Sequence, residues 1–265
     1  MRDRILKHRP LPWHEERQTI STPWLVPFHS VNWFLAWVSW TLSHWVLLDV
    51  LEHLGTFSVL VAVIFYFADS GNRLKQKHYQ AWQVINTAQG KGGSGGRIDA
   101  LQELNNDHVS LVGVDASGAF LRGILLERAH LERCNLDSAD LRNGDLKFAK
   151  LSDSDLQSTN FREADLTGAD LSSADLQDAD LNQANFEKAN LAHSNLSRAD
   201  LRNADFRDVQ WNEIQSLKQA NIYGVRNAPP DFLVFAQKQG AISLASDDDW
   251  NAALRKSAAG GSTGK

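Results

Sequence analysis

The sequence lacks the residue patterns that mark most enzyme and metal sites. It has one cysteine among 265 residues, Cys134, which excludes an intramolecular disulfide framework. Its nine histidines form no pair at a metal-ligand spacing such as His-Glu-x-x-His, and no Gly-x-Ser-x-Gly motif occurs. The net charge of −5 excludes little by itself. We therefore expect no catalytic, cofactor-binding or metal-binding residues and predict that the protein is not an enzyme.

A nucleotide-binding loop is also missing, although glycine is concentrated in residues 90–96. A phosphate-binding loop needs Gly-x4-Gly-Lys followed by Ser or Thr, after a strand. Here Gly90-Lys91 is followed by Gly92, and Ile85 stands five places before Gly90. The composition instead predicts a flexible linker.

What the sequence does contain is a leucine or phenylalanine every five residues between Val109 and Asp208. Central positions from 111 to 206 give 20 consecutive units, of which 16 hold Leu and three hold Phe. Two places earlier, 12 of the 20 residues are Ala, and one place earlier 15 are Asp or Asn. A fixed internal period is decisive for the fold.

A period of five fits neither a helix nor a flat strand. Five helical steps turn each Leu by roughly 140°, so no apolar stripe results. In a strand an odd repeat sends successive leucines to opposite faces. The pattern works if the chain turns once per repeat, so that four repeats close a square coil of about 20 residues. Stacked about 4.8 Å apart, five coils give a rod with Leu on its axis and Ala beside it.

Units such as Ala164-Asp165-Leu166 and Ala174-Asp175-Leu176 resemble the pentapeptide-repeat family. The resemblance covers about 100 of the 265 residues. It implies an all-β solenoid, a right-handed quadrilateral β-helix, but it implies no single function. We expect this solenoid to be preceded by one or two transmembrane helices and capped by short helices, as in a membrane-anchored member.

Two apolar segments precede the repeat. Residues 31–48 carry no formal charge but many Trp and polar residues, whereas 51–68 has the apolar density of a bilayer span. The flanks are basic and the turn from Asp49 to His53 is acidic, which favours a hairpin with both ends in the cytoplasm. An interfacial first segment with a single span is the alternative, and a buried soluble hairpin is a third interpretation. We expect the inner membrane, with a cytoplasmic repeat domain.

The parts expected outside the repeat are assigned by composition and spacing. Ile98, Leu101 and Leu104 suggest a capping helix that would cover the outward Phe120 and Leu125. The expected organisation is a basic N-terminus 1–23, a membrane segment 24–69, a helix and Gly-rich linker 70–96, an N-terminal cap 97–107, the β-helix 108–208, a C-terminal cap 209–245 and a disordered tail 246–265. The helix before the linker is expected at 72–89. Trp211, Ile214 and Leu217, with a helix from Asp231 to Gln239, form the expected C-terminal cap.

Cys134 occupies the small inward position of its repeat and is expected to be a buried structural thiol. His130 stands four residues earlier, at an outward position, so the two do not form a pair. Residues 20 apart share a face, so that Asp155 stacks on Asp175. Because close carboxylates oppose joint ionisation, the sequence predicts that Asp175→Asn is neutral or stabilising.

Two classes of function follow. The first is a membrane-tethered scaffold that presents a rigid rod to another, unidentified protein, with the lipid bilayer as its second partner. The second draws on the family resemblance: an acidic mimic of DNA that modulates a type II topoisomerase. Residues 109–208 hold 18 acids against 11 bases, yet eight arginines interrupt the negative surface. We favour the scaffold and expect no direct nucleic-acid binding.

Overall fold

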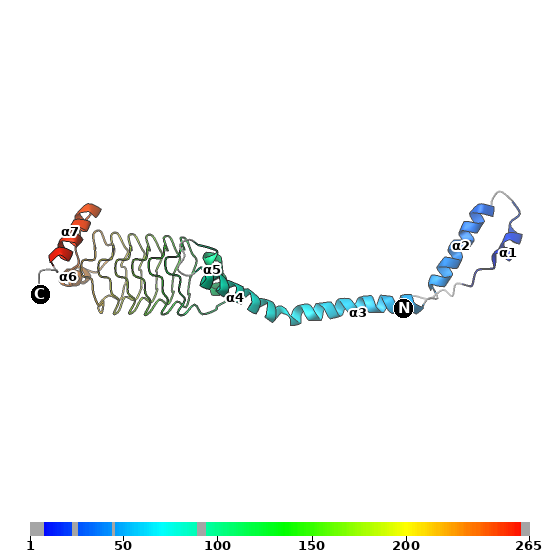
Figure 1. Cartoon of the computed structure of the whole chain (residues 1–265), viewed down its shortest axis with the longest axis horizontal. Helices are drawn as coiled ribbons and strands as arrows, with labels where there is room; N and C mark the ends of the chain where they lie inside the picture. The colour runs from blue at the N-terminus through cyan, green and yellow to red at the C-terminus, as the bar shows by residue number, and fades with distance from the viewer. Residues whose placement is uncertain (1–7, 23–25, 44–45, 89–93, 261–265) are drawn as a thin grey trace. The chain divides into compact units, whose positions relative to one another are not determined.

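The computed structural model describes residues 8–22, 26–43, 46–88 and 94–260 (Figure 1). The chain divides into two compact units, Met1–Arg73 and Leu74–Lys265. The described residues of the first unit hold α1 (Trp13–Glu16), the 3-10 turn η1 (Arg17–Thr19), α2 (Val26–Ser43), α3 (Val46–Ala68) and the start of α4 (Ser70–Thr87). The indole N–H of Trp33 in α2 donates to the carbonyl oxygen of Leu11 at 2.7 Å. This bond holds the N-terminal segment on α2.

The hairpin turn predicted at Asp49–His53 is wrong in position, because these residues lie inside α3. No Gly or Pro stands between Val46 and Leu54, so nothing there interrupts helical hydrogen bonding. The first predicted span, 31–48, is likewise divided, since α2 ends at Ser43 and α3 begins at Val46. Residues 44–45 lie outside the described residues.

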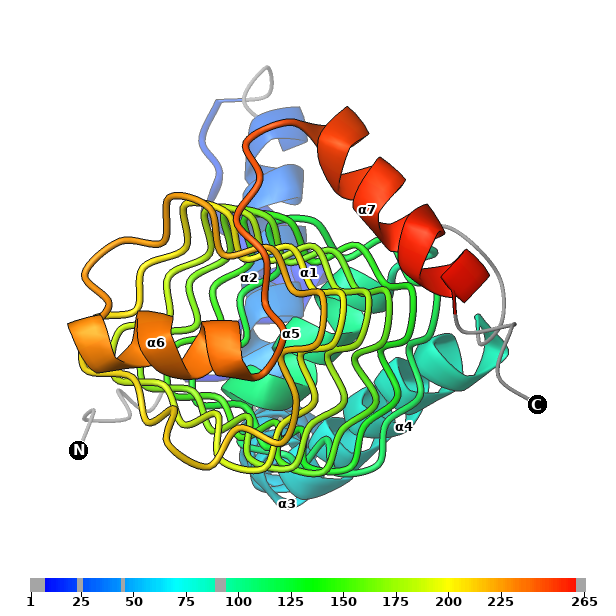
Figure 2. The same ribbon diagram turned by 90° about the vertical axis from the view of Figure 1, so that its left-hand side faces the viewer.

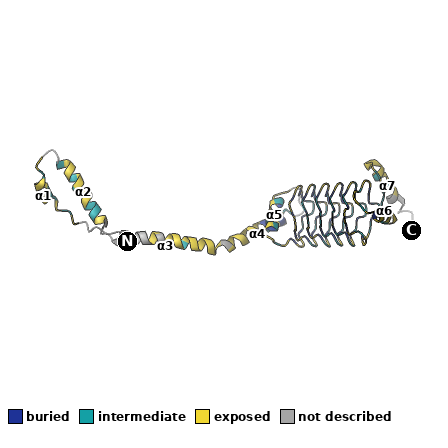
Figure 3. Ribbon diagram, turned by 180° about the vertical axis from the view of Figure 1, so that it is seen from behind, coloured by how far each residue is buried: buried dark blue, intermediate teal, exposed yellow. Residues whose placement is uncertain are grey.

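The second predicted span, 51–68, is helical and its apolar side chains are exposed. Phe57, Ile64, Phe65 and Phe67 are each more than half exposed, as the yellow stretch of α3 in Figure 3 shows. In the described part of the chain no single helix is long and apolar enough to cross a bilayer. The pair Phe57–Ala68 and Gly71–Thr87, which meet at a 43° bend, meets both criteria when taken together.

The repeat forms a four-sided coil in which the residue before each central position pairs with its equivalent in the next coil, 20 positions later over most of the rod. Parallel bridges join, for example, Asp140 to Asn160 and Asp155 to Asp175, and Figure 2 shows the stacked coils end-on. Leu121 N–H donates to the Asp140 carbonyl at 2.8 Å, and Asp140 N–H donates back to Ala119 at 2.9 Å. Each pairing is a single bridge, with no extended strand among the described residues. The right-handed sense stays an expectation from the resemblance.

The core confirms the predicted phase of the repeat. Leu171, Leu176 and Leu181 are fully buried, and Ala174 is 1% exposed. The three phenylalanines at central positions, Phe161, Phe186 and Phe206, are buried as well. The axis is therefore a continuous apolar stack, with alanine filling the space beside most of the large side chains.

The second residue after each central position holds a left-handed conformation that the sequence did not reveal. Ser173 has φ of 60° and Asp178 has φ of 61°. This conformation turns the chain at each corner, and side chains with a Cβ adopt it at a cost. Gly occupies the same position at Gly168, where a Cβ would also meet the Phe148 ring at 2.6 Å.

We expect Ser173→Gly to raise the free energy of unfolding by about 0.5–1 kcal/mol, because glycine adopts positive φ without strain. The neighbouring Ser172→Gly is the matched control: Ser172 does not have positive φ, so added freedom of the unfolded chain should lower stability by a similar amount. Urea unfolding midpoints measure both. Shifts in the same direction would contradict the turn assignment.

Two helices close the N-terminal end of the rod. They are α4 (Ser70–Thr87) and α5 (Arg97–Asn106). Leu101 and Leu104 of α5 are buried against the first coil, and Ile85 of α4 is buried with them. His78 Nε2 lies 2.8 Å from Asp107 Oδ2. The helix expected at 97–107 is present as α5, and α4 from Leu74 onward packs in the same unit.

The cap also forms hydrogen bonds with backbone groups of the first coil, which has no preceding coil to pair with. Gln102 Oε1 accepts a hydrogen bond from Leu125 N–H at 3.1 Å, and Asn105 Nδ2 donates to the Glu127 carbonyl at 3.1 Å. Such groups are costly when unpaired. The predicted cover of Phe120 and Leu125 is wrong, since they are 57% and 58% exposed. The helix reaches the backbone there and leaves these outward side chains exposed.

Residues 90–93 of the predicted linker 90–96 lie outside the described residues. Beyond them, Arg97 N–H donates to the Ser94 carbonyl at 2.6 Å. Arg97 itself is fully buried; burial lowers its pKa and nearby Asp115 opposes that effect. The described end of the Gly-rich stretch is therefore a turn that leads directly into the cap.

The C-terminal cap begins as a sixth coil. Bridges after Asn190–Gln210 shift from 20 to 21 residues, as in Asn195–Ser216 and Asp200–Asn221. One extra residue between 211 and 216 moves the inward position to Leu217, which is fully buried. The predicted total of five coils is therefore wrong, because the regular five-residue period ends at this insertion while the coil continues beyond it.

Helix α6 (Pro230–Lys238) lies across the end of the rod (Figure 2). Its Phe232 is fully buried, and the ring centroid is 4.7 Å from that of Phe206 and 5.7 Å from that of Trp211. Pro230 at the first helical position suits the start of a helix. The helix expected from Asp231 to Gln239 is present as α6, shifted by one residue at each end.

The disordered tail predicted for 246–265 is wrong for its described part. Residues Asp247–Gly260 form α7. Three aspartates occupy its first turn, where a helix dipole favours negative charge. Trp250 Nε1–H donates to the Gln219 carbonyl at 3.3 Å, which holds this helix on the sixth coil. Residues 261–265 lie outside the described residues.

Candidate functional site: the outward columns of the rod

The rod carries its polar side chains in columns along four faces. Because equivalent residues are 20 apart, each outward position repeats about every 4.8 Å along the axis. The residue before each central Leu is usually Asp or Asn, and its side-chain oxygen accepts a hydrogen bond from the N–H two residues later. Asp175 Oδ1 accepts from Gln177 at 3.1 Å, and Asp180 Oδ1 accepts from Asn182 at 3.1 Å. The Asp and Asn columns are therefore part of the turns.

Like charges stack in these columns, as predicted, and neighbouring donors compensate them. The bridged Asp145 and Asp165 share Lys147, whose Nζ lies 3.0 and 3.2 Å from their carboxylates. Asp175 Oδ2 accepts from Gln157 Nε2 at 2.9 Å. The carboxylates thus form specific bonds that the sequence pattern did not show.

These bonds change the expectation for Asp175→Asn. The new amide keeps one oxygen for the turn, but its NH2 cannot accept from Gln157. We expect a loss of about 0.5–1 kcal/mol in the free energy of unfolding, where the sequence alone predicts none. In a Gln157→Ala background the same change should have little effect. Chemical denaturation of the unaltered chain, the two single variants and the double variant measures the coupling free energy between Asp175 and Gln157. A coupling free energy of zero would show that their hydrogen bond does not contribute to stability.

One face carries a column of arginines at the position directly after the central residue. This Arg column consists of Arg122, Arg142, Arg162, Asn182 and Arg202. Arg142 binds Asp140 through two bonds, Nε to Oδ1 at 2.8 Å and Nη2 to Oδ2 at 2.6 Å. The pKa of Asp140 is lowered by this side-chain bond, while partial burial opposes the shift. Arg162 instead reaches Asp180 in the next coil, at 3.1 Å.

Arg202 is the most enclosed arginine of the Arg column. It binds Asp200 with the same two bonds, at 2.8 and 2.6 Å, and its side chain is 11% exposed. Its Nη2 also lies 2.5 Å from Asp247 Oδ1, and its guanidinium carbon is 5.5 Å from the centroid of the Trp250 ring. Helix α7 is therefore held on this face by one charge pair and one cation–π contact.

The sequence profile of pentapeptide repeats matches residues 110–147, 145–183 and 169–208, in eight copies. These residues are pentapeptide repeats. The match agrees with the 20-residue register of the coil. No curated protein matches the chain.

Several solved structures of pentapeptide-repeat proteins are similar to the chain. Rfr23 from the cyanobacterium Cyanothece 51142 is 34% identical over 36% of this chain, with a TM-score of 0.32; the chain spans 60% of that protein. A thylakoid-lumen protein of Arabidopsis thaliana is 26% identical over 52% of this chain and 81% of its own, with a TM-score of 0.29. QnrB1, a plasmid-mediated fluoroquinolone resistance protein, is 18% identical, covers 57% and 85% of the two chains, and has a TM-score of 0.29.

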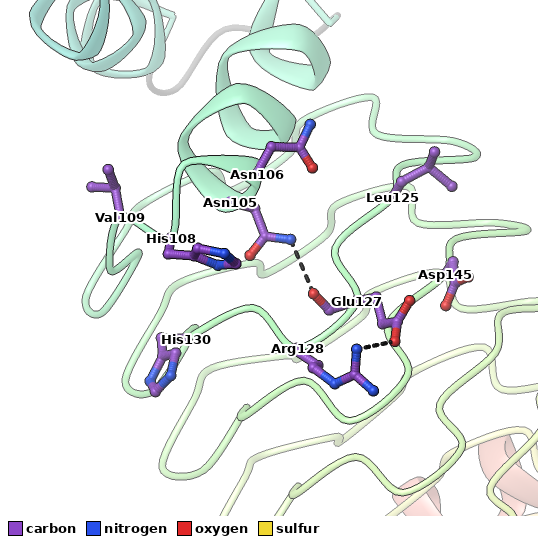
Figure 4. Close-up of a pocket in the computed structure, with 9 residues that line it drawn as sticks. All are labelled: Asn105, Asn106, His108, Val109, Leu125, Glu127, Arg128, His130 and Asp145. Carbon is purple, nitrogen blue, oxygen red and sulfur yellow. Dashed lines mark hydrogen bonds and ion pairs between the residues drawn. The ribbon is translucent and has the colours of Figure 1, made fainter. Parts of the chain in front are cut away.

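A cavity of about 580 Å³ lies where the cap meets the pentapeptide rod. Figure 4 shows it between the end of α5 and the first coils, with His108, His130 and Leu125 among the lining residues. Arg128 pairs with Glu127 at 2.8 Å, so its charge is balanced within the cavity wall. His130 Nδ1 lies 3.2 Å from Glu132 Oε1. The described residues hold no group of three or more metal-ligating side chains, here or elsewhere.

Cys134 and His130 lie as predicted, one inside the pentapeptide rod and one outside. Cys134 is 2% exposed, while half of the His130 side chain is accessible. Burial raises the pKa of the Cys134 thiol to about 11, and a hydrogen bond with Ser154 opposes the shift. The thiol donates to Ser154 Oγ at 3.3 Å, and that hydroxyl donates to the Leu131 carbonyl at 2.9 Å. At neutral pH this cysteine is protonated and enclosed.

Proposed function

We propose that the chain is a membrane-tethered, non-enzymatic scaffold whose pentapeptide rod binds another protein in the cytoplasm. The observation that carries this proposal is the fixed order of the outward columns. Every coil is hydrogen-bonded to the next at all four faces, as at Leu121, Leu126, Leu131 and Leu136. A rigid surface of this kind presents its side chains at fixed spacings. Because the backbone is already ordered before a partner binds, the entropy cost of association is lower.

A tether is supported by the apolar surface of α3. Phe57, Leu60, Ile64 and Phe67 are more than half exposed within the described residues. An exposed apolar surface of this size needs a cover, from lipid or from protein. Arg73, Lys75 and Lys77 follow α3 directly, and basic residues beside an apolar segment favour the cytoplasmic side. These features support the proposed location of the rod, in the cytoplasm at the inner membrane.

Accessibility labelling of single cysteines tests the tether. Pro10→Cys, Ser43→Cys and Lys150→Cys are made in a background where Cys134 is replaced by Ala, and intact cells are treated with an impermeant thiol reagent. A hairpin of α2 and α3, which would turn between Ser43 and Val46, predicts labelling from outside at position 43 alone. Labelling at 10 with protection at 150 supports the single span. Labelling at 150 contradicts the cytoplasmic scaffold.

Photo-crosslinking tests the scaffold itself. A crosslinking amino acid is placed at one exposed position on each face: Asp153, Ser158, Glu163 and Lys188. A rod with a docking face predicts one defined adduct from one or two adjacent faces. Equal, diffuse products from all four faces contradict the proposal. Capture of a type II topoisomerase subunit supports the acidic mimic instead.

A further inference from the structure

The contact between α7 and the rod shows what Arg202, one member of the Arg column, binds. Arg202 holds Asp247, in the first turn of α7, and lies over Trp250. It also donates from Nη1 to the Ala245 carbonyl at 3.3 Å. The bound element is therefore the acidic N-terminus of a helix, with a tryptophan three residues after the paired aspartate.

The same arginine arrangement recurs three coils earlier, at Arg142. Both arginines bind the aspartate two residues before them, through Nε at 2.8 Å and Nη2 at 2.6 Å. Both aspartates also accept the arginine N–H, at 3.2 and 3.1 Å. An arginine has five N–H donors, and this pairing with the aspartate uses two of them. At Arg202 others reach Asp247 and Ala245; at Arg142 the side chain is 41% exposed.

The coils on either side of Arg142 extend the same chemistry. Arg122 and Arg162 occupy the same column one coil away in each direction and are exposed. At about 4.8 Å per coil, the three guanidinium groups cover roughly 10 Å, which matches about two turns of a helix. Their exposed surface lies over a hydrogen-bonded backbone, so a partner meets it already ordered.

We propose that Arg122, Arg142 and Arg162 form a docking surface for the acidic, aromatic-bearing N-terminus of a helix from a partner protein. Arg142 is the anchor, because it repeats the geometry that Arg202 offers to α7. The chain's own α7 is engaged at Arg202 and Gln219, so this helix does not occupy the Arg142 surface, which we assign to a partner. This inference rests on the proposed scaffold function and assigns it one face and one partner chemistry.

Binding of a synthetic peptide tests the inference. The probe is a fluorescein-labelled peptide with the sequence of residues 243–260, titrated with the full chain in detergent micelles and followed by fluorescence anisotropy. Arg142→Gln is expected to weaken binding about tenfold or more, because a close charge pair is lost. Arg133→Gln removes the same charge from another face and should leave the affinity unchanged. A probe with Asp247→Asn and Trp250→Ala should bind weakly.

Other results overturn the inference. Equal affinities of the Arg142→Gln and Arg133→Gln chains would show that only net charge matters. Loss of binding in Arg202→Gln alone would show that the peptide replaces α7 at its own place. If Arg142→Gln lowers the thermal midpoint of unfolding, Arg162→Gln replaces it as the test variant. It too should weaken binding of the peptide. No binding to the unaltered chain rejects the Arg142 surface, while crosslinks from another face would still support the scaffold.

Discussion

Replacing Phe206 by alanine is expected to lower the free energy of unfolding by about 3–5 kcal/mol. Phe206 is fully buried, and its ring lies 5.5 Å from Phe186 and 4.7 Å from Phe232. The substitution leaves a cavity where the last regular coil meets α6, so the core and the cap lose contacts together. Urea unfolding followed by circular dichroism measures the loss.

Phe148→Ala is the matched control for that experiment. Phe148 is 48% exposed and has Arg128 over its ring at 5.5 Å. Losing an exposed cation–π contact should cost no more than about 1 kcal/mol. A loss as large as that of Phe206→Ala would mean that burial along the axis is not the main source of stability.

The second large effect is expected from Ala174→Phe, which should destabilise the rod by about 1–3 kcal/mol or more. Ala174 is 1% exposed beside the fully buried Leu171 and Leu176, and the hydrogen-bonded coils on either side cannot separate to admit a ring. Ala192→Phe makes the same change at a partly exposed position and should stay within about 0.5 kcal/mol. Thermal and urea midpoints compare the two. Equal midpoints would show that the inward phase of the repeat is misassigned.

The core could be predicted from the sequence because one period fixes every inward position. Ala174 and Leu176 are buried for the reason the spacing gives: the chain turns once per repeat. The sixth coil could not be predicted in the same way, since the extra residue before Ser216 changes the phase. The hairpin turn at Asp49 failed for a different reason: charge suggested a turn where helix-forming residues continue the helix.

The candidate site could be predicted only in part. The 20-residue spacing already places Arg122, Arg142 and Arg162 on one face. The sequence gives no sign that Arg202 would hold Asp247, because that contact joins segments 45 residues apart, and the composition of the tail suggested disorder. The docking surface could therefore be inferred only once the contact between Arg202 and Asp247 was known from the structure.

The one-residue insertion in the sixth coil has a consequence for assembly. A regular coil ends in a row of backbone groups ready to pair with an identical coil, which is how rods grow into fibres. Here the last coil is out of register, Ile222 N–H already donates to the Ile242 carbonyl at 2.9 Å, and Gln219 N–H donates to Gly240 at 2.8 Å. With α6 across the same end, the rod has a defined length and is protected from end-to-end polymerisation.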